Sequence, residues 1–322
     1  MTSTRAVLPR RRFLGLSAAG TLAALGDLGL LGHLPPVASA EARIDPARVR
    51  LQPGIEPLVR LLEDTPRERV LEEVGARIRR GLAYPDLLAA LLLAGVRNIQ
   101  PRPVGFKFHA VLVVNSAHLA SLASPASDRW LPLLWAVDQF KSSQAADVRA
   151  GDWTLGPVDE AAVPAADKAR AAFVAAMDRW DEAAADAAIA GLARTARPAE
   201  IFEVLARYGA RDFREIGHKA IYVANSFRTL DVIGWQHAEP VLRSLAYALL
   251  DKDGDAGNPS TSDLPADRPY RLNEQSATRL RAGWSDGHAS ADGTREMLHA
   301  LRQATPEAAS AGVSSSTAEL YL

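Results

Sequence analysis

The chain contains no cysteine in its 322 residues. This absence excludes disulfide bonds, a thiolate nucleophile, cysteine-bound zinc and thiolate-held iron–sulfur clusters. A metal ion would have to be bound by imidazole, carboxylate, tyrosine or water. The seven histidines are therefore the most informative residues for a metal site.

Strand patterns, long apolar runs and basic blocks are also scarce. The most apolar stretch, LLAALLLAGV at residues 87–96, is about half the roughly 20 residues that a transmembrane helix needs. Without a Lys- or Arg-rich block, nucleic acid is not expected as a partner. The chain also lacks a GxGxxG loop after a strand, a Walker A loop, HExxH and GxSxG, so the familiar nucleotide-binding and hydrolase signatures are missing.

The first 40 residues carry the pattern of an export signal. Residues 9–15, PRRRFLG, resemble the twin-arginine motif, with Arg10 and Arg11 as the pair. A weakly apolar stretch follows at 13–34, and the small residues 38–40, ASA, form a cleavage pattern. We expect passage through the twin-arginine export machinery, removal of residues 1–40 by signal peptidase, and a periplasmic or secreted protein with no stable membrane span.

A retained membrane anchor is the alternative for the same segment, but Asp27, His33 and several glycines lower its hydrophobicity. Loss of residues 1–40 removes four arginines and one aspartate, which leaves 33 basic and 37 acidic side chains and a net charge of −4. The remaining 282 residues are long enough to fold around a core without disulfides. The twin-arginine resemblance implies export in the folded state, often with a metal or redox cofactor already bound.

The remaining sequence predicts an all-α fold. Helical spacing, proline at first turns and glycine at ends indicate helices near residues 65–80, 85–94, 165–180, 181–196, 198–208, 213–233 and 235–250. Another helix is expected after Ser127 and Asp128, with residues 131–138 at helical spacing. The apolar run at 110–114 fits a buried strand by itself, but the sequence that follows it to residue 122 favours a helix. We expect antiparallel helix pairs, packed as a bundle or α/α array, over residues 41–250. Residues 251–322 are expected to be a linker and a weakly ordered C-terminal extension with one short helix at 294–303.

Polar residues follow one face of the helix predicted at 213–233. His218, Tyr222, Asn225 and Thr229 are spaced so that they share this face. His237 follows a turn and is expected roughly 20 Å from His218 if the two helices form a hairpin. The predicted catalytic residues are His218, Tyr222, Asn225 and His237, with a histidine as base or ligand and Tyr222 and Asn225 orienting the substrate.

The other histidine-bearing segment holds His109 and His118, which are nine residues apart and so lie on opposite sides of an ideal helix. We expect one of them to meet His218 across the core, with Asp138 or Glu239 completing the site. The predicted metal ligands are His109, His118, His218 and Asp138. Two histidines and one carboxylate suit non-haem iron, although another histidine-bound metal stays open. The structural alternative is that each histidine simply bonds to a backbone carbonyl.

Two segments, HAVLVVNSAHLASL at 109–122 and IGHKAIYVANSFRTLDVIGWQHAEPVLRSLAYAL at 216–249, resemble bacterial exported proteins of unassigned chemistry. Histidine-bearing helices followed by small and aromatic residues are also similar to the questin oxidase-like group, within residues 85–250. That group consists mostly of helical proteins linked to oxidative ring opening of aromatic ketones. The resemblance implies an oxidoreductase and assigns no catalytic residue.

The leading hypothesis is an exported oxidoreductase of a small, hydrophobic organic substrate. A non-catalytic helical ligand-binding or scaffold protein is the first alternative, and it predicts dispersed histidines bonded to backbone. A metal-dependent hydrolase is the second, and it requires a carboxylate beside the histidines, for which Asp138, Asp231 and Glu239 are candidates.

Overall fold

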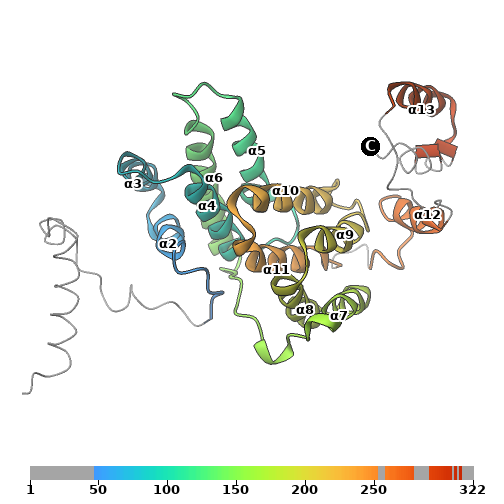
Figure 1. The fold of residues 1–322 in the computed structure, drawn as a ribbon, viewed down its shortest axis with the longest axis horizontal. Coiled ribbons are helices and arrows are strands. Elements are labelled where there is room, and N and C mark those ends of the chain that lie inside the picture. The colour runs from blue at the N-terminus through green and yellow to red at the C-terminus, as the bar shows by residue number, and fades with distance from the viewer. Residues whose placement is uncertain (1–46, 253–257, 279–289, 307, 310–311, 314–322) are drawn as a thin grey trace, which may run out of the picture. The chain divides into compact units, whose positions relative to one another are not determined.

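The computed structural model describes residues 47–252, 258–278, 290–306, 308–309 and 312–313. The predicted export signal and parts of the C-terminal extension lie outside these residues. Within them, twelve α-helices and three short 3-10 turns are present and no strand is formed (Figure 1). The all-α prediction is therefore confirmed.

Most helices lie where the sequence places them: α3 (Arg67–Arg79), α4 (Tyr84–Asn98), α5 (His109–Ala123), α6 (Leu131–Ala150), α7 (Ala166–Arg179), α8 (Glu182–Thr195), α9 (Pro198–Gly209), α10 (His218–Ile233), α11 (Ala238–Leu249) and α13 (Ala291–Gln303). Trp180, with a left-handed φ of 59°, separates α7 from α8 as expected. Helices α2 (Glu56–Asp64) and α12 (Arg268–Ala277) were not predicted. Helix α10 starts five residues later than predicted because Ile216 and Gly217 have positive φ angles, which end helical geometry.

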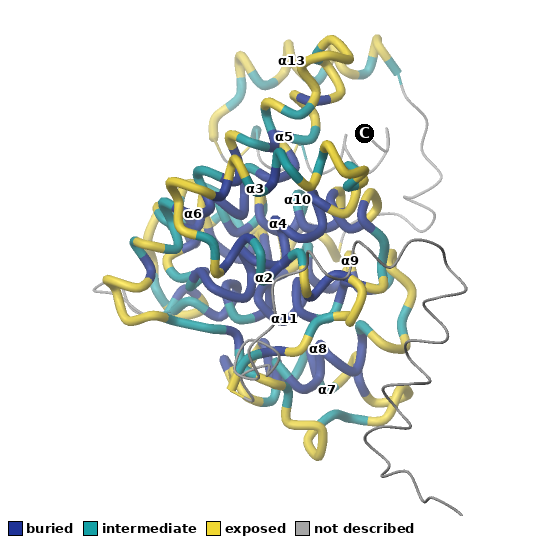
Figure 2. The backbone as a smooth tube through the Cα atoms, turned by 90° about the vertical axis from the view of Figure 1, so that its left-hand side faces the viewer, coloured by how far each residue is buried: buried dark blue, intermediate teal, exposed yellow. Residues whose placement is uncertain are grey.

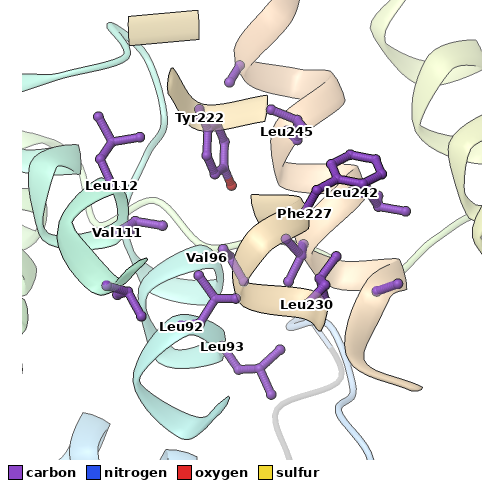
Figure 3. Packing of buried hydrophobic residues seen from close by; sticks show 14 of the residues in the cluster. Leu92, Leu93, Val96, Val111, Leu112, Tyr222, Phe227, Leu230, Leu242 and Leu245 are labelled. Carbon is purple, nitrogen blue, oxygen red and sulfur yellow. The ribbon is translucent and has the colours of Figure 1, made fainter. Parts of the chain in front are cut away.

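Helix α4 forms the centre of the core. Every residue from Leu87 to Asn98 is buried, and α4 contacts α2, α5, α6, α10 and α11 (dark blue in Figure 2). A helix that is apolar on all sides requires this position, because no face can be left to water. Figure 3 shows its side chains among those of α5, α10 and α11, including Leu92, Val96, Val111, Tyr222 and Leu245.

One charged cluster interrupts this apolar core. Arg97 of α4 is only 2% exposed and donates to both oxygens of Glu63, at 2.6 and 2.7 Å. It also donates to Glu56 at 2.9 Å, and Asn98 donates to Glu63 at 2.5 Å. Both glutamates lie on α2, seven residues apart and hence on one face of that helix. The cluster therefore attaches α2 to the core through charge-assisted hydrogen bonds.

The segment after α11 makes contacts with the α9–α10 connection. The Phe213 amide donates to the Ala266 carbonyl at 3.0 Å, and Arg214 donates to the buried carboxylate of Asp267 at 2.9 Å. Arg207 of α9 reaches Glu274 of α12. Among the helices that the structure describes, none is long and apolar enough to cross a membrane.

Candidate functional site

His109 and His218 lie together where two helices begin. His109 is the first residue of α5 and His218 the first residue of α10. Their Nε2 atoms are 3.0 Å apart, the ring centroids are 4.8 Å apart, and the ring planes are nearly perpendicular at 89°. The expectation that a histidine of the first segment meets His218 is therefore met by His109. The pair does not cross the core, however, because His109 is exposed and His218 half-buried.

Backbone carbonyls determine which ring nitrogen of each histidine carries hydrogen. Nδ1 of His109 lies 2.9 Å from the Phe106 carbonyl oxygen, and Nδ1 of His218 lies 2.5 Å from that of Glu215. Because a carbonyl oxygen only accepts, each Nδ1 must donate. In a neutral ring the other nitrogen, Nε2, then carries a lone pair. Two lone pairs therefore face each other, an arrangement that a metal ion or one shared proton would stabilise.

The backbone before each helix has an uncommon conformation. Phe106 and Ile216 both have φ angles of 48°, in the left-handed region that non-glycine residues rarely adopt. Gly105 has a φ of 133°, and a Cβ atom there would lie 3.4 Å from Nδ1 of His218 and 3.6 Å from Cε1 of His109. The backbone at Gly105 therefore passes close to both rings, which a larger residue could not do without strain. Such local conformations concentrate at functional sites.

The separations within the pair are compatible with two ligands to one metal ion. For rings pointing symmetrically at one shared point, the 3.0 and 4.8 Å separations place that point about 2 Å from each Nε2, the usual Zn–N bond length. A backbone carbonyl that accepts from Nδ1 is a common outer partner of a metal-bound histidine. No group of three or more His, Cys, Asp or Glu suited to a metal occurs in the part of the chain that the structure describes. The remaining coordination positions would therefore be open to water or substrate.

The structure does not bring the four predicted ligands, His109, His118, His218 and Asp138, into one group. His118 shares a hydrogen bond of 3.1 Å with the Tyr84 hydroxyl, and burial lowers its pKa. Asp138 accepts two hydrogen bonds from Arg67, at 2.8 and 2.7 Å, and this contact holds its pKa below the usual range. The nine-residue spacing turns His118 away from His109. The carboxylate of Asp138 is bonded to Arg67 and does not join the histidines.

The predicted catalytic set of His218, Tyr222, Asn225 and His237 is not brought together either. The buried Tyr222 hydroxyl donates to Ser244 of α11 at 3.0 Å, and burial raises its pKa. The Asn225 amide donates to the Leu112 carbonyl of α5 at 2.9 Å. Both side chains therefore join α10 to neighbouring helices. His237 lines a separate cavity, and burial lowers its pKa against the opposing charge of Asp86.

The other carboxylates considered for hydrolysis are also occupied. Glu239 accepts from Arg194 at 2.7 and 3.0 Å, and Asp231 accepts from the Trp235 indole at 3.0 Å. Neither belongs to a cluster with the histidine pair among the described residues. The carboxylate that a metal-dependent hydrolase needs is therefore not provided by these three candidates.

Glu215 is a functional candidate that the sequence reasoning missed. Its backbone carbonyl accepts from His218, while burial raises the pKa of its side chain to about 7. Lys219 opposes this shift, whereas the negative charges of Asp251 and Asp212 add to it. Its Oε2 atom is buried and has no hydrogen-bond partner. The presence of Asp212, Glu215 and Lys219 within six residues of His218 is a signal that could have identified it.

Exposed apolar side chains flank the histidine pair. Phe106 is 79% exposed and Ile216 is 85% exposed, and both precede the histidines by two or three residues. Phe213 and Ile221 are also exposed large apolar residues, within five positions of His218. We call Phe106, Phe213, Ile216 and Ile221 the apolar rim. Large apolar residues exposed together mark surfaces that bind a ligand or partner.

The chain matches no protein-family model, and no curated protein or solved structure is significantly similar to it. Its function is therefore inferred from the residues of the site.

Proposed function

We propose that this protein is an exported, metal-dependent oxidoreductase of small apolar organic substrates, with the metal ion bound by His109 and His218. The observation that carries the proposal is the 3.0 Å separation of two Nε2 atoms whose Nδ1 partners are both committed to backbone carbonyls. Two opposed lone pairs repel each other unless a metal ion or a shared proton lies between them, and the proposal assigns the metal ion to this position.

Copper is the redox-active ion that this donor set favours. Imidazole ligands suit zinc, copper, iron and nickel, and Cu²⁺ binds such sites more tightly than Fe²⁺. A carboxylate ligand would have supported the non-haem iron hypothesis, but none joins the pair among the described residues. The bound ion would supply one-electron chemistry, while the Phe106 and Glu215 carbonyls hold the imidazoles in the ligating tautomer.

The apolar rim accounts for the substrate class. Phe106 and Ile216 project from the two loops that position the histidines, so an apolar molecule bound against them would lie beside the open coordination positions. Association would bury these exposed side chains, at about 25 cal/mol per Å² of apolar surface removed from water. The rim would also exclude water from the reacting centre.

The two alternative functions fit the geometry less well. A scaffold in which each histidine bonds only to a backbone carbonyl does not explain why two rings face each other through Nε2 at 3.0 Å. A metal-dependent hydrolase lacks its carboxylate, because Asp138, Asp231 and Glu239 are each bonded to an arginine or tryptophan.

The proposal is tested with protein purified without a histidine tag or chelator and titrated with Cu²⁺. We expect one tightly bound ion per chain and an electron paramagnetic resonance spectrum with two nitrogen couplings. His109→Ala and His218→Ala should each remove this binding, and His118→Ala is the matched control on the same helix. Binding that survives both single variants would overturn the metal site.

The oxidoreductase part is tested separately by oxygen uptake with simple phenols and ketones. We expect uptake that needs both copper and His109, and that falls several-fold in Phe106→Ser, which alters the rim and leaves the ligands in place. Tight copper binding without any oxygen uptake or substrate oxidation would leave the metal site standing and refute the oxidoreductase.

Export by the twin-arginine route is part of the same proposal, and it concerns residues outside the described part of the chain. Replacement of Arg10 and Arg11 by lysine should retain the uncleaved protein in the cytoplasm. Export of that variant at the normal rate would contradict this route.

A further inference from the structure

We propose that a second site, in the cavity between α2, the end of α3 and His237, binds an amphipathic organic anion such as a medium-chain carboxylate. The cavity has a volume of about 630 Å³, in the range of small-molecule sites. None of its lining residues belongs to the histidine pair. The inference therefore does not rest on the proposed metal chemistry.

Two arginines give the cavity its positive charge. Arg77 and Arg80 both line it, three residues apart at the C-terminal end of α3. Neither guanidinium has an ion-pair or hydrogen-bond partner among the described residues, whereas Arg67, Arg97 and Arg243 are all bonded to carboxylates. Asp86 is the one carboxylate that lines the cavity, so the two arginines leave a net positive charge. A carboxylate is the group that matches two guanidinium donors.

His237 is a further polar group that lines the cavity. It is only 8% exposed and lines the cavity, yet its ring makes no hydrogen bond within the described part of the chain. Its ring is therefore free to donate to an oxygen of an anion bound in the cavity.

Part of the lining is apolar. Leu58 and Leu61 of α2 and Leu82 of the α3–α4 turn line the same cavity as the arginines. A small inorganic anion would not use this apolar part, and a neutral hydrocarbon would not use the arginines. The ligand that satisfies both parts has a negatively charged head and an unbranched apolar chain.

The proposal is tested by calorimetry with octanoate, 1-octanol and acetate as probes, in buffer containing a chelator. We expect saturable octanoate binding at one site, with 1-octanol and acetate at least tenfold weaker. The double variant Arg77→Ala/Arg80→Ala should lose at least tenfold in octanoate affinity and leave 1-octanol unchanged. Arg79→Ala is the matched control, because Arg79 is exposed on the same helix and does not line the cavity.

A second variant keeps the test independent of the surface arginines. His237→Phe preserves the shape of the side chain and removes its hydrogen-bonding nitrogens, and it should weaken octanoate several-fold. His109→Ala should bind octanoate as the wild type does. Equal affinity for octanoate and 1-octanol, an equal loss in Arg79→Ala, or no saturable binding would overturn the proposal.

Discussion

The Arg97 cluster and the His109–His218 pair are two polar contacts between helices. They differ in whether each hydrogen-bond acceptor meets a donor. In the buried cluster, Arg97 and Asn98 donate and Glu56 and Glu63 accept, so donors meet acceptors. In the half-exposed pair, two acceptor nitrogens meet each other at 3.0 Å. The first arrangement is complete within the chain and stabilises the fold. The second needs a metal ion or a shared proton between its two nitrogens, and this is why we assign function to it.

Loss of Arg97 should give the largest effect on stability. Arg97→Met leaves Glu56 and Glu63 buried without their partner, which costs about 3–5 kcal/mol in unfolding free energy. Urea denaturation measures the loss, and Arg67→Met, which removes the partly exposed Asp138 pair, should cost far less. Copper affinity should not change in either variant that remains folded. Equal losses in the two variants would remove the distinction between buried and exposed pairs.

Metal binding should stabilise the folded chain through the histidine pair. At a free Cu²⁺ concentration 100 times the Kd, linkage adds about 2.7 kcal/mol to the unfolding free energy. His109→Ala should remove this gain. Without metal it should change the unfolding free energy little, because the His109 side chain is exposed. Thermal unfolding with and without metal measures the difference. A gain that persists in His109→Ala would assign the stabilisation to another site.

Glu215 should make the region beside the pair sensitive to pH. Its pKa of about 7 in the folded chain is above its ordinary value of 4.5, so the folded state binds this proton more tightly. Ionisation of Glu215 lowers the unfolding free energy. This loss is absent below pH 4.5, grows between pH 4.5 and 7, and is constant above pH 7. Glu215→Gln should therefore add about 1–2 kcal/mol at pH 8, after allowance for partial solvent screening, and nothing at pH 4.

Unfolding free energies of the wild type and Glu215→Gln across this pH range measure the effect. Glu203→Gln is a suitable control, since this glutamate of α9 is exposed. A constant difference between Glu215→Gln and the wild type at all pH values would contradict the raised pKa.

Loss of the Tyr222 hydroxyl should have the smallest effect on the unfolding free energy. Tyr222→Phe removes one buried hydrogen bond to Ser244 and should cost about 1 kcal/mol in unfolding free energy. Substrate oxidation and copper affinity should stay at wild-type values, because the hydroxyl bonds to α11 and not to the pair. A large fall in oxidation rate with little loss of stability would restore Tyr222 as a catalytic residue.

Helix positions were predictable because local signals such as Pro85, Pro198 and the break at Trp180 decide them. Helix α2 was missed because its stability depends on Glu56 and Glu63 meeting Arg97, which is 34 or more residues away. The meeting of His109 with His218 was predictable as one of several options. The roles of Asp138 and Tyr222 were not, because their partners Arg67 and Ser244 are distant in sequence.

The proposed metal site requires that both histidines carry hydrogen on Nδ1 and present a bare Nε2 to each other. Long-range ¹H–¹⁵N correlation spectra of the histidine rings, recorded without metal and then with Zn²⁺, test it most directly. We expect the Nδ1–H tautomer at His109 and His218, and a change in both Nε2 signals at one equivalent of Zn²⁺. Hydrogen on both Nε2 atoms, or Nε2 signals that do not respond to Zn²⁺, would contradict the account.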